Sequence, residues 1–257
     1  MFPLYDENFR ESKFPLVTVF IIIICVIVFW MTTFNAPQTY TLLTGNNPRV
    51  LLKDPAVREY IHELEVQGIN PLSSEGISIL ANAKLVSLLG VVPAQILNGK
   101  GFMTLLTSLF LHGGFLHLLG NMWFLWIFGD NVENIFGKFK YLLFYLTAGA
   151  VAALAHVFLV PASDIYIPVI GASGGIAAVL GSYAVMLPRH RIATFFTLGF
   201  FFRIIRVPAF FFLGIWFLYQ FLLFNTPSNV AYTAHIAGFV FGITIGLLVK
   251  ISGRARI

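Results

Sequence analysis

The sequence has 257 residues, of which 58% are hydrophobic and only 11% are charged, and its mean hydropathy is +0.85. Soluble globular domains carry about 25% charged residues, so this composition excludes that class and indicates a protein that crosses a membrane several times. The formal net charge of +5 does not indicate a nucleic-acid partner, because the basic residues gather at the ends of apolar segments, where they set membrane topology.

Apolar segments close to the length of a bilayer-crossing helix, about 20 residues, occur six times along the chain. They cover residues 14–34, 115–128 (extending to about 132), 141–160, 168–187, 207–224 and 231–249. The sequence therefore predicts an all-α membrane protein with six transmembrane helices, folded as one domain over 1–257. Its parts are a short cytoplasmic segment at 1–13, a long, partly membrane-embedded outer loop at 35–104 and a core at 105–250.

Three shorter segments lie between the predicted spans. Asp54-Pro55 predicts the start of a short helix, because proline is common in the first turn. Residues 77–96 are apolar but are interrupted by polar residues and a proline, so we predict an amphipathic segment on or in the outer leaflet and not a seventh span. Residues 194–202 are too few to span and are followed by two arginines; we predict an interfacial or re-entrant segment.

The loop charges predict the orientation of the chain. Eleven Lys and Arg residues fall on the side that holds both termini, and five fall in the long first loop on the other side. Because cytoplasmic loops carry the excess of Lys and Arg, we expect both termini in the cytoplasm. The expected location is the cell (inner) membrane, as an integral multi-pass protein.

Four polar residues lie near the predicted outer ends of three different spans. His117 and Asn121 lie at the start of the second span, Ser173 at the start of the fourth and His235 at the start of the sixth. At about 5.4 Å per helical turn, all four fall in the same outer slab of the membrane. Polar and ionisable residues inside a membrane are costly and are functional candidates, so we expect these four to form one site.

Small residues on two of these spans predict how the site is assembled. On the sixth span, Gly238 and Gly242 share a helical face with His235, and on the fourth span Ala177 shares one with Ser173. Such faces allow two helix backbones to approach closely. If the two faces pack together, Ser173 and His235 meet at one end of the seam.

The residue types indicate nucleophilic catalysis. A serine is a weak nucleophile and needs a base within about 2.6–3.2 Å, and a neutral imidazole such as that of His235 is a suitable base near pH 7. His117 and Asn121 lie four residues apart, on one helical face, and could donate to an oxyanion together with the Ser173 backbone N–H. The outer halves of these spans hold no carboxylate, so we predict a Ser–His dyad without an acid.

The motifs around these residues occur in a characteristic order. They are His112 and His117-Leu-Leu-Gly-Asn121, then Gly129 through Glu133 to Gly137, then Gly171-Ala-Ser173-Gly174, then Ala234-His235-Ile-Ala-Gly238-Phe-Val-Phe-Gly242. With the stretch from Arg206-Val-Pro-Ala to Phe221, they cover the chain from about residue 104 onward. In type and order they resemble the rhomboid family of intramembrane serine proteases, in its bacterial six-helix form.

The resemblance implies a role for each matched residue. Ser173 would be the nucleophile, His235 the general base, and His117 and Asn121 the oxyanion donors. Structural support would come from His112, Gly171, Gly174, Glu133, Gly137, Gly238 and Gly242. The implied partners are the lipid bilayer and single-span membrane proteins, which enter beside the fifth span and are cut near the outer end of a helix. No cofactor, metal ion or nucleic acid is implied.

Two positions depart from the family pattern. Family members often have Trp-Arg where this chain has Met103 and Thr104, which removes the usual anchor of the first loop. An aromatic residue often follows the serine by four positions and packs on the histidine ring, but here that residue is Ala177. Another ring must therefore orient His235.

Other functions remain open on the sequence alone. A non-catalytic relative would bind transmembrane helices as a chaperone or adaptor, but such proteins usually lack the serine or the histidine, and both are present here. A transporter or channel would be expected to show an inverted repeat or paired broken helices with charged midplane residues, and the sequence shows neither. The histidines of the spans, including His156, lack an HExxH pattern or a close acidic ligand, so a zinc site is not predicted.

Overall fold

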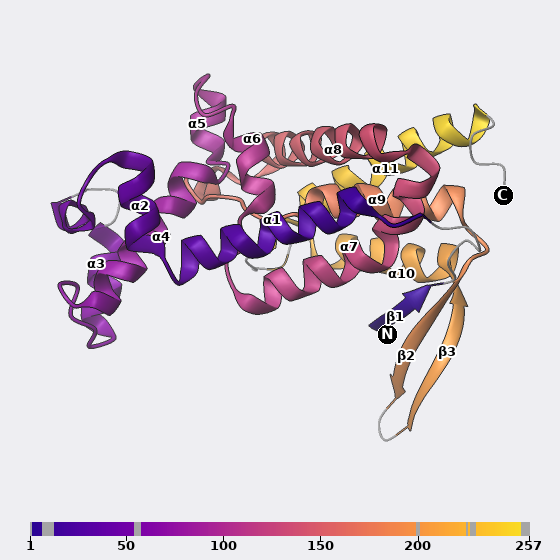
Figure 1. Ribbon diagram of the computed structural model, residues 1–257, viewed down its shortest axis with the longest axis horizontal. Helices are drawn as coiled ribbons and strands as arrows, with labels where there is room; N and C mark the ends of the chain where they lie inside the picture. Colours follow the sequence, from indigo (N-terminus) through magenta and orange to yellow (C-terminus); the bar gives the residue numbers. More distant parts are fainter. Residues whose placement is uncertain are drawn as a thin grey trace.

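The computed structural model describes residues 2–6, 13–53, 58–198, 201–224, 226 and 230–252. It is an elongated bundle of helices with a small sheet at one end (Figure 1). The long helices are α1 (Leu16–Thr33), α7 (Phe115–Phe136), α8 (Lys138–Leu159), α9 (Ser173–Met186), α10 (Ala209–Leu223) and α11 (Tyr232–Ile251).

These helices occupy the six apolar segments, but they do not all have the properties of a membrane span. Among the described residues, α1, α8 and α11 are long and apolar enough to cross a membrane, whereas α9 and α10 are shorter apolar helices. α7 has 22 residues and carries Asp130 and Glu133 in its C-terminal half. The mostly helical membrane architecture is therefore confirmed, and the count of six spans stays a prediction.

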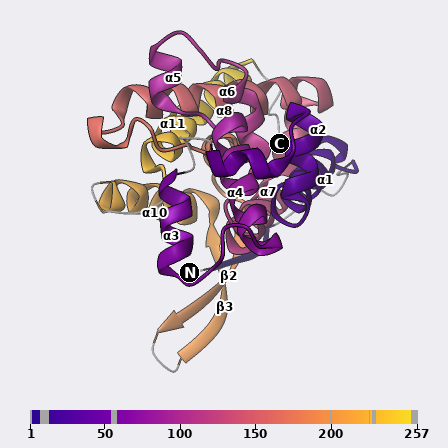
Figure 2. The ribbon, with the colours of Figure 1, turned by 90° about the vertical axis from the view of Figure 1, so that its left-hand side faces the viewer.

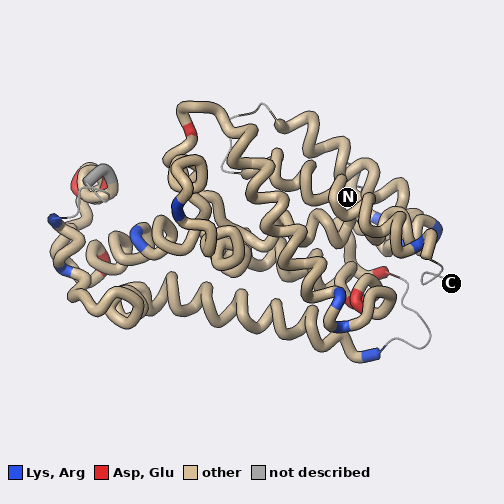
Figure 3. The backbone as a smooth tube through the Cα atoms, turned by 90° about the horizontal axis from the view of Figure 1, so that it is seen from above, with Lys and Arg blue, Asp and Glu red and all other residues tan. Residues whose placement is uncertain are grey.

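Charged residues lie mainly toward the two ends of the elongated molecule. Figure 3 shows Lys, Arg, Asp and Glu at and near the ends of the tube, with a central section between them that is nearly free of charge. A section of this kind matches the hydrocarbon interior of a bilayer, where charges are costly.

α9 is the centre of the bundle and contacts α7, α8, α10 and α11. Its sequence has no polar face, and nearly all of its residues are buried. A helix that is hydrophobic on all sides is expected in the interior of a fold. The main hydrophobic core forms around it and includes Leu125, Phe128, Tyr145, Leu180 and Tyr183.

α9 and α11 pack backbone to backbone through small residues. A Cβ atom built on Gly238 would overlap the carbonyl oxygen of Gly174, and one built on Gly242 would overlap that of Ala178. A Cβ atom built on Gly246 would lie 2.9 Å from the Cα of Ser182. These pairs keep a constant offset along both helices, so the helices run parallel. The two small-residue faces therefore meet, and they fix the register of α11 against α9.

The segment between α1 and α7 folds into short helices with a small core of its own. These are α2 (Ala36–Thr44), η1 (Pro48–Lys53), α3 (Arg58–Val66), α4 (Ser74–Leu89), α5 (Pro93–Leu97), α6 (Thr104–Thr107) and η3 (Ser108–Phe110). Their core includes Tyr40, Leu51, Leu64 and Leu80. The amide of Asn82 donates to the Thr32 carbonyl at 2.6 Å, which ties α4 to the end of α1. The predicted helix start at residues 54 and 55 lies outside the described residues.

This loop is anchored although Met103 and Thr104 replace the usual Trp-Arg pair. Met103 is 73% exposed, so it makes no anchor. The Thr107 hydroxyl instead donates to the Leu89 carbonyl at 2.6 Å. Val91 forms an antiparallel bridge with Val169, just before α9. A turn of η4 (Ala162–Asp164) lies between α8 and this bridge.

The prediction of an all-α fold is wrong at one end of the molecule. β1 (Phe2–Asp6), β2 (Arg191–Leu198) and β3 (Phe201–Pro208) form an antiparallel sheet in the order β1-β2-β3. Of the residues predicted as an interfacial or re-entrant segment, 194–198 lie in β2 and 201–202 lie in β3. The two strands project from the helices in both views (Figures 1 and 2). Threonine, phenylalanine and isoleucine favour strands, and the partner strand β1 is far away in sequence.

Candidate active site

Ser173 is the first residue of α9 and is half-buried. The chain enters it through Gly171, whose φ of +124° is a conformation that L side chains rarely adopt. The Gly171 N–H donates to the Ser108 carbonyl at 2.9 Å, and the Val91–Val169 bridge holds the residues before it. This extended entry is why α9 begins five residues later than the predicted span.

Gly171 also provides space for the ring of His117. A Cβ atom built on Gly171 would lie 2.9 Å from His117 Nε2 and 3.8 Å from Ser173 Oγ. The imidazole of α7 and the hydroxyl of α9 therefore converge on the same point. His117 itself is exposed, so a substrate or water can reach this point.

The register of α11 brings His235 to the same level. His235 lies nearly one turn before Gly238, which packs on the Gly174 carbonyl, so His235 falls level with the chain entry just before α9. Ser173 is the first residue of α9, and its side chain points back toward this level. Within the described residues, no hydrogen bond joins Ser173 Oγ to His235, so the two groups share a level but are not bonded to each other.

α10 supplies two of the groups that contact the His235 ring. The Nδ1 atom of His235 is 2.9 Å from Oε1 of Gln220. The ring of Trp216 lies 6.0 Å away, centroid to centroid, at 30°, and Tyr232 of α11 lies edge-on at 6.2 Å. Trp216 thus takes the place that Ala177 leaves open. Neither α10 residue was predicted from the sequence, although an amide in so apolar a helix (AFFFLGIWFLYQFLL) is a signal that could have identified Gln220.

The second polar pair comes from one turn of α7. Asn121 is buried, and its Nδ2 donates to the His117 carbonyl at 2.8 Å. An amide nitrogen carries two N–H groups, so one remains for another acceptor. His112, also buried, lies edge to face with His117 at 5.2 Å and supports that ring.

The other predicted support residues lie at helix contacts. A Cβ atom on Gly174 would lie 2.7 Å from the Cβ of Ala152 on α8. Glu133 accepts hydrogen bonds from the backbone N–H groups of Val17 and Thr18 at 3.0 and 2.8 Å. It therefore satisfies the first turn of α1, which has no side-chain cap of its own. Gly137, with φ +76°, forms the turn between α7 and α8.

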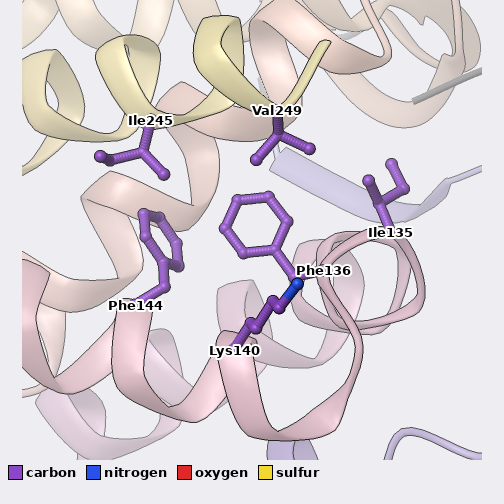
Figure 4. Close-up of a pocket in the computed structure, with 6 residues that line it drawn as sticks. All are labelled: Ile135, Phe136, Lys140, Phe144, Ile245 and Val249. Carbon is purple, nitrogen blue, oxygen red and sulfur yellow. The ribbon is translucent and has the colours of Figure 1, made fainter. Parts of the chain in front are cut away.

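Two apolar cavities lie outside this site. One, of about 180 Å³, is at the end of the bundle opposite Ser173. Figure 4 shows the side chains around it, which are Ile135, Phe136, Lys140, Phe144, Ile245 and Val249. The other, of about 610 Å³, is an open groove between α8, α10 and α11. Neither contains the predicted catalytic residues.

The fold and the site define a class: a helical membrane protein whose polar side chains gather on one level at one end of apolar helices. The chain belongs to the rhomboid family, because the model of the Rhomboid domain matches residues 99–252.

Curated relatives include both mitochondrial and bacterial proteins. The bovine (Bos taurus) "Presenilin-associated rhomboid-like protein, mitochondrial" is 30% identical over 145 residues, which cover 54% of this chain and 36% of the relative. Rhomboid protease GluP of Bacillus subtilis is 32% identical over 138 residues, 54% of this chain and 24% of the relative. The putative rhomboid protease YdcA of the same organism is 32% identical over 90 residues, 35% of this chain and 43% of the relative. The matched part of the chain spans less than half the length of these relatives.

Proposed function

We propose that this protein is an intramembrane serine endopeptidase that cleaves transmembrane segments of other proteins near their outer ends. One observation carries the proposal. The His117 ring and the Ser173 hydroxyl converge on Gly171, at the level where the register of α11 places His235. Membership of a family that includes proteins named as rhomboid proteases supports the same activity.

The proposed reaction is acyl transfer in two steps. Ser173 Oγ bonds to the substrate carbonyl carbon while its proton moves to Nε2 of His235, and the peptide C–N bond breaks as that proton passes to the leaving amine. A water molecule then attacks the acyl-enzyme, with His235 again taking and returning the proton. His117, the second N–H of Asn121 and the backbone N–H of Ser173 would stabilise the oxyanion, each such donor contributing about 10²–10³ in rate.

The proposed surroundings are a cell membrane, with six spans, both termini in the cytoplasm and the site open to the outer face. The central section that is nearly free of charge supports a bundle that spans the membrane (Figure 3), and the excess of Lys and Arg on the side of the termini favours this orientation. The proposed substrates are single-span membrane proteins that enter laterally beside α10.

The test uses purified full-length protein in proteoliposomes with a fluorescent transmembrane substrate. Ser173→Ala and His235→Ala should each abolish turnover, and a fluorophosphonate probe should label the wild-type protein but not Ser173→Ala. Ser163→Ala and His62→Ala are matched controls, because Ser163 is exposed on η4 and His62 is exposed on α3, and both should cleave normally. Full turnover by either catalytic variant would reject the proposal. Substrate capture without any cleavage by the wild-type protein would favour the chaperone or adaptor instead.

A further inference from the structure

Gln220 is an amide that lies inside an apolar helix and has only 4% of its surface exposed. Burying an amide without hydrogen bonds is costly, so both ends of this side chain need partners. Nε2 donates to the Trp216 carbonyl at 3.0 Å, and Oε1 lies 2.9 Å from Nδ1 of His235. Both ends are therefore satisfied.

The Trp216 contact fixes which way the amide of Gln220 faces. A backbone carbonyl only accepts hydrogen bonds, so the NH₂ group must be the end that faces Trp216. The oxygen of Gln220 is then the atom that faces His235. This oxygen also only accepts, and so Nδ1 of His235 must carry the proton in the hydrogen bond between them.

This hydrogen bond determines the tautomer of His235. A neutral imidazole carries one N–H, so a proton on Nδ1 leaves the lone pair on Nε2. Nε2 lies on the side of the ring away from Gln220, and it is the nitrogen that a general base needs. When Nε2 takes up a proton, the Gln220 oxygen still accepts from Nδ1 and stabilises the imidazolium.

We propose that Gln220 is a positioning residue for His235: it selects the Nδ1–H tautomer and orients Nε2 as the base for Ser173. The proposal rests on the proposed function and adds to it a third side chain, contributed by α10, that takes the place of an acid. Trp216, one turn earlier on α10, holds the face of the same ring.

The kinetic test compares Gln220→Met with Gln220→Glu. Methionine has similar length but no strong acceptor, so kcat should fall on the order of 10- to 100-fold, part of the 10²–10⁴ that a positioned base contributes. KM should change little, because the Gln220 side chain is buried and bonded within the bundle to His235 and Trp216, and so is not on the exposed face of α10. Glutamate again accepts from Nδ1, so Gln220→Glu should recover most of the turnover lost in Gln220→Met. Gln67→Met, at an exposed glutamine just after α3, is the matched control and should cleave normally.

A purely structural role predicts a different result. Glutamate would then be at least as damaging as methionine, because it adds a charge to an apolar helix, and that ranking would overturn the proposal. An unchanged kcat in Gln220→Met would also overturn it, while cleavage that still depends on Ser173 would leave the proposed function standing.

A second measurement does not depend on how the variants fold. Histidine-selective ¹⁵N NMR of the full-length protein, assigned with His235→Ala, should show His235 as the Nδ1–H tautomer in the wild type. Gln220→Met should give a mixture of tautomers if it folds. An Nε2–H tautomer in the wild type would overturn the proposal.

Discussion

At the scale of single residues, Gly171 has the most restricted position in the candidate site. Its φ of +124° is strained for any residue with a side chain. Its missing Cβ also leaves room for the His117 ring, which would otherwise lie within 2.9 Å. The same glycine therefore shapes the entry to Ser173, the proposed nucleophile, and the space for His117, a proposed oxyanion donor.

Replacing Gly171 with alanine should displace the His117 ring and strain the backbone before Ser173. Because loss of one oxyanion donor costs on the order of 10²–10³ in rate, we expect kcat/KM for a transmembrane substrate to fall by about that factor. Gly214→Ala is the control, since a Cβ on this α10 glycine would meet nothing within 4 Å. Equal activity of the two variants would show that Gly171 does not shape the site.

At the scale of elements, the N-terminal strand β1 ties α7 to α9, with contacts that run from the middle of α7 to the ends of both helices away from the candidate site. Trp123 of α7 donates to the Pro3 carbonyl at 2.7 Å. Beyond it, Asp6 accepts from Tyr183 of α9 and Asn131 of α7, each at 2.6 Å. β1 therefore fixes α7, which carries His117, against α9, which carries Ser173.

The Asp6 carboxyl should make stability depend on pH. Burial raises its pKa from 3.8 to about 7, and nearby Asp130 adds to the rise, although the hydrogen bonds from Tyr183 and Asn131 oppose it. The folded state thus holds a proton that the unfolded state has released, so this group's contribution to the free energy of unfolding decreases as pH rises from about 4 to about 7.

Asp6→Asn keeps an acceptor for both donors and removes this titration. Thermal unfolding in detergent at pH 5 and pH 8 measures the effect. The unfolding temperature of the variant, relative to that of the wild type, should be higher at pH 8 than at pH 5. A difference between the two proteins that is the same at both pH values would contradict the assignment.

The sequence predicted elements whose signal is local and missed those that depend on distant partners. Runs of apolar residues located the long helices within a few residues, except at the start of α9, where Gly171 keeps the chain extended. β1 was missed because its partner strand β2 lies far along the chain. β2 and β3 pair locally, but their apolar residues were interpreted as an interfacial or re-entrant segment. Gln220 was missed because a single amide on α10 does not reveal that its partner is His235 on another helix.

At the scale of the whole molecule, the short helices after α1 and the sheet lie at opposite ends (Figure 1). The bundle between them has a section nearly free of charge (Figure 3). The Rhomboid domain match begins at residue 99, after most of the first loop. Most of the first loop, with its own core, is therefore an addition to the matched region. If the bundle spans a membrane, the first loop and the sheet must be exposed on opposite sides of it.

This arrangement can be tested by cysteine labelling, because Cys25 is the only cysteine and is fully buried. Glu65→Cys places a thiol on exposed α3, and Lys138→Cys places one at the exposed start of α8. In intact bacterial cells, a membrane-impermeant maleimide should label Glu65→Cys and should label Lys138→Cys only after the membrane is opened. Ser252→Cys, just after α11, should behave like Lys138→Cys, because an even number of spans places the turn after α7 and the end of α11 on one side. Labelling of Glu65→Cys and Lys138→Cys from the same side would rule out the six-span topology, and with it a site that opens to the outer face.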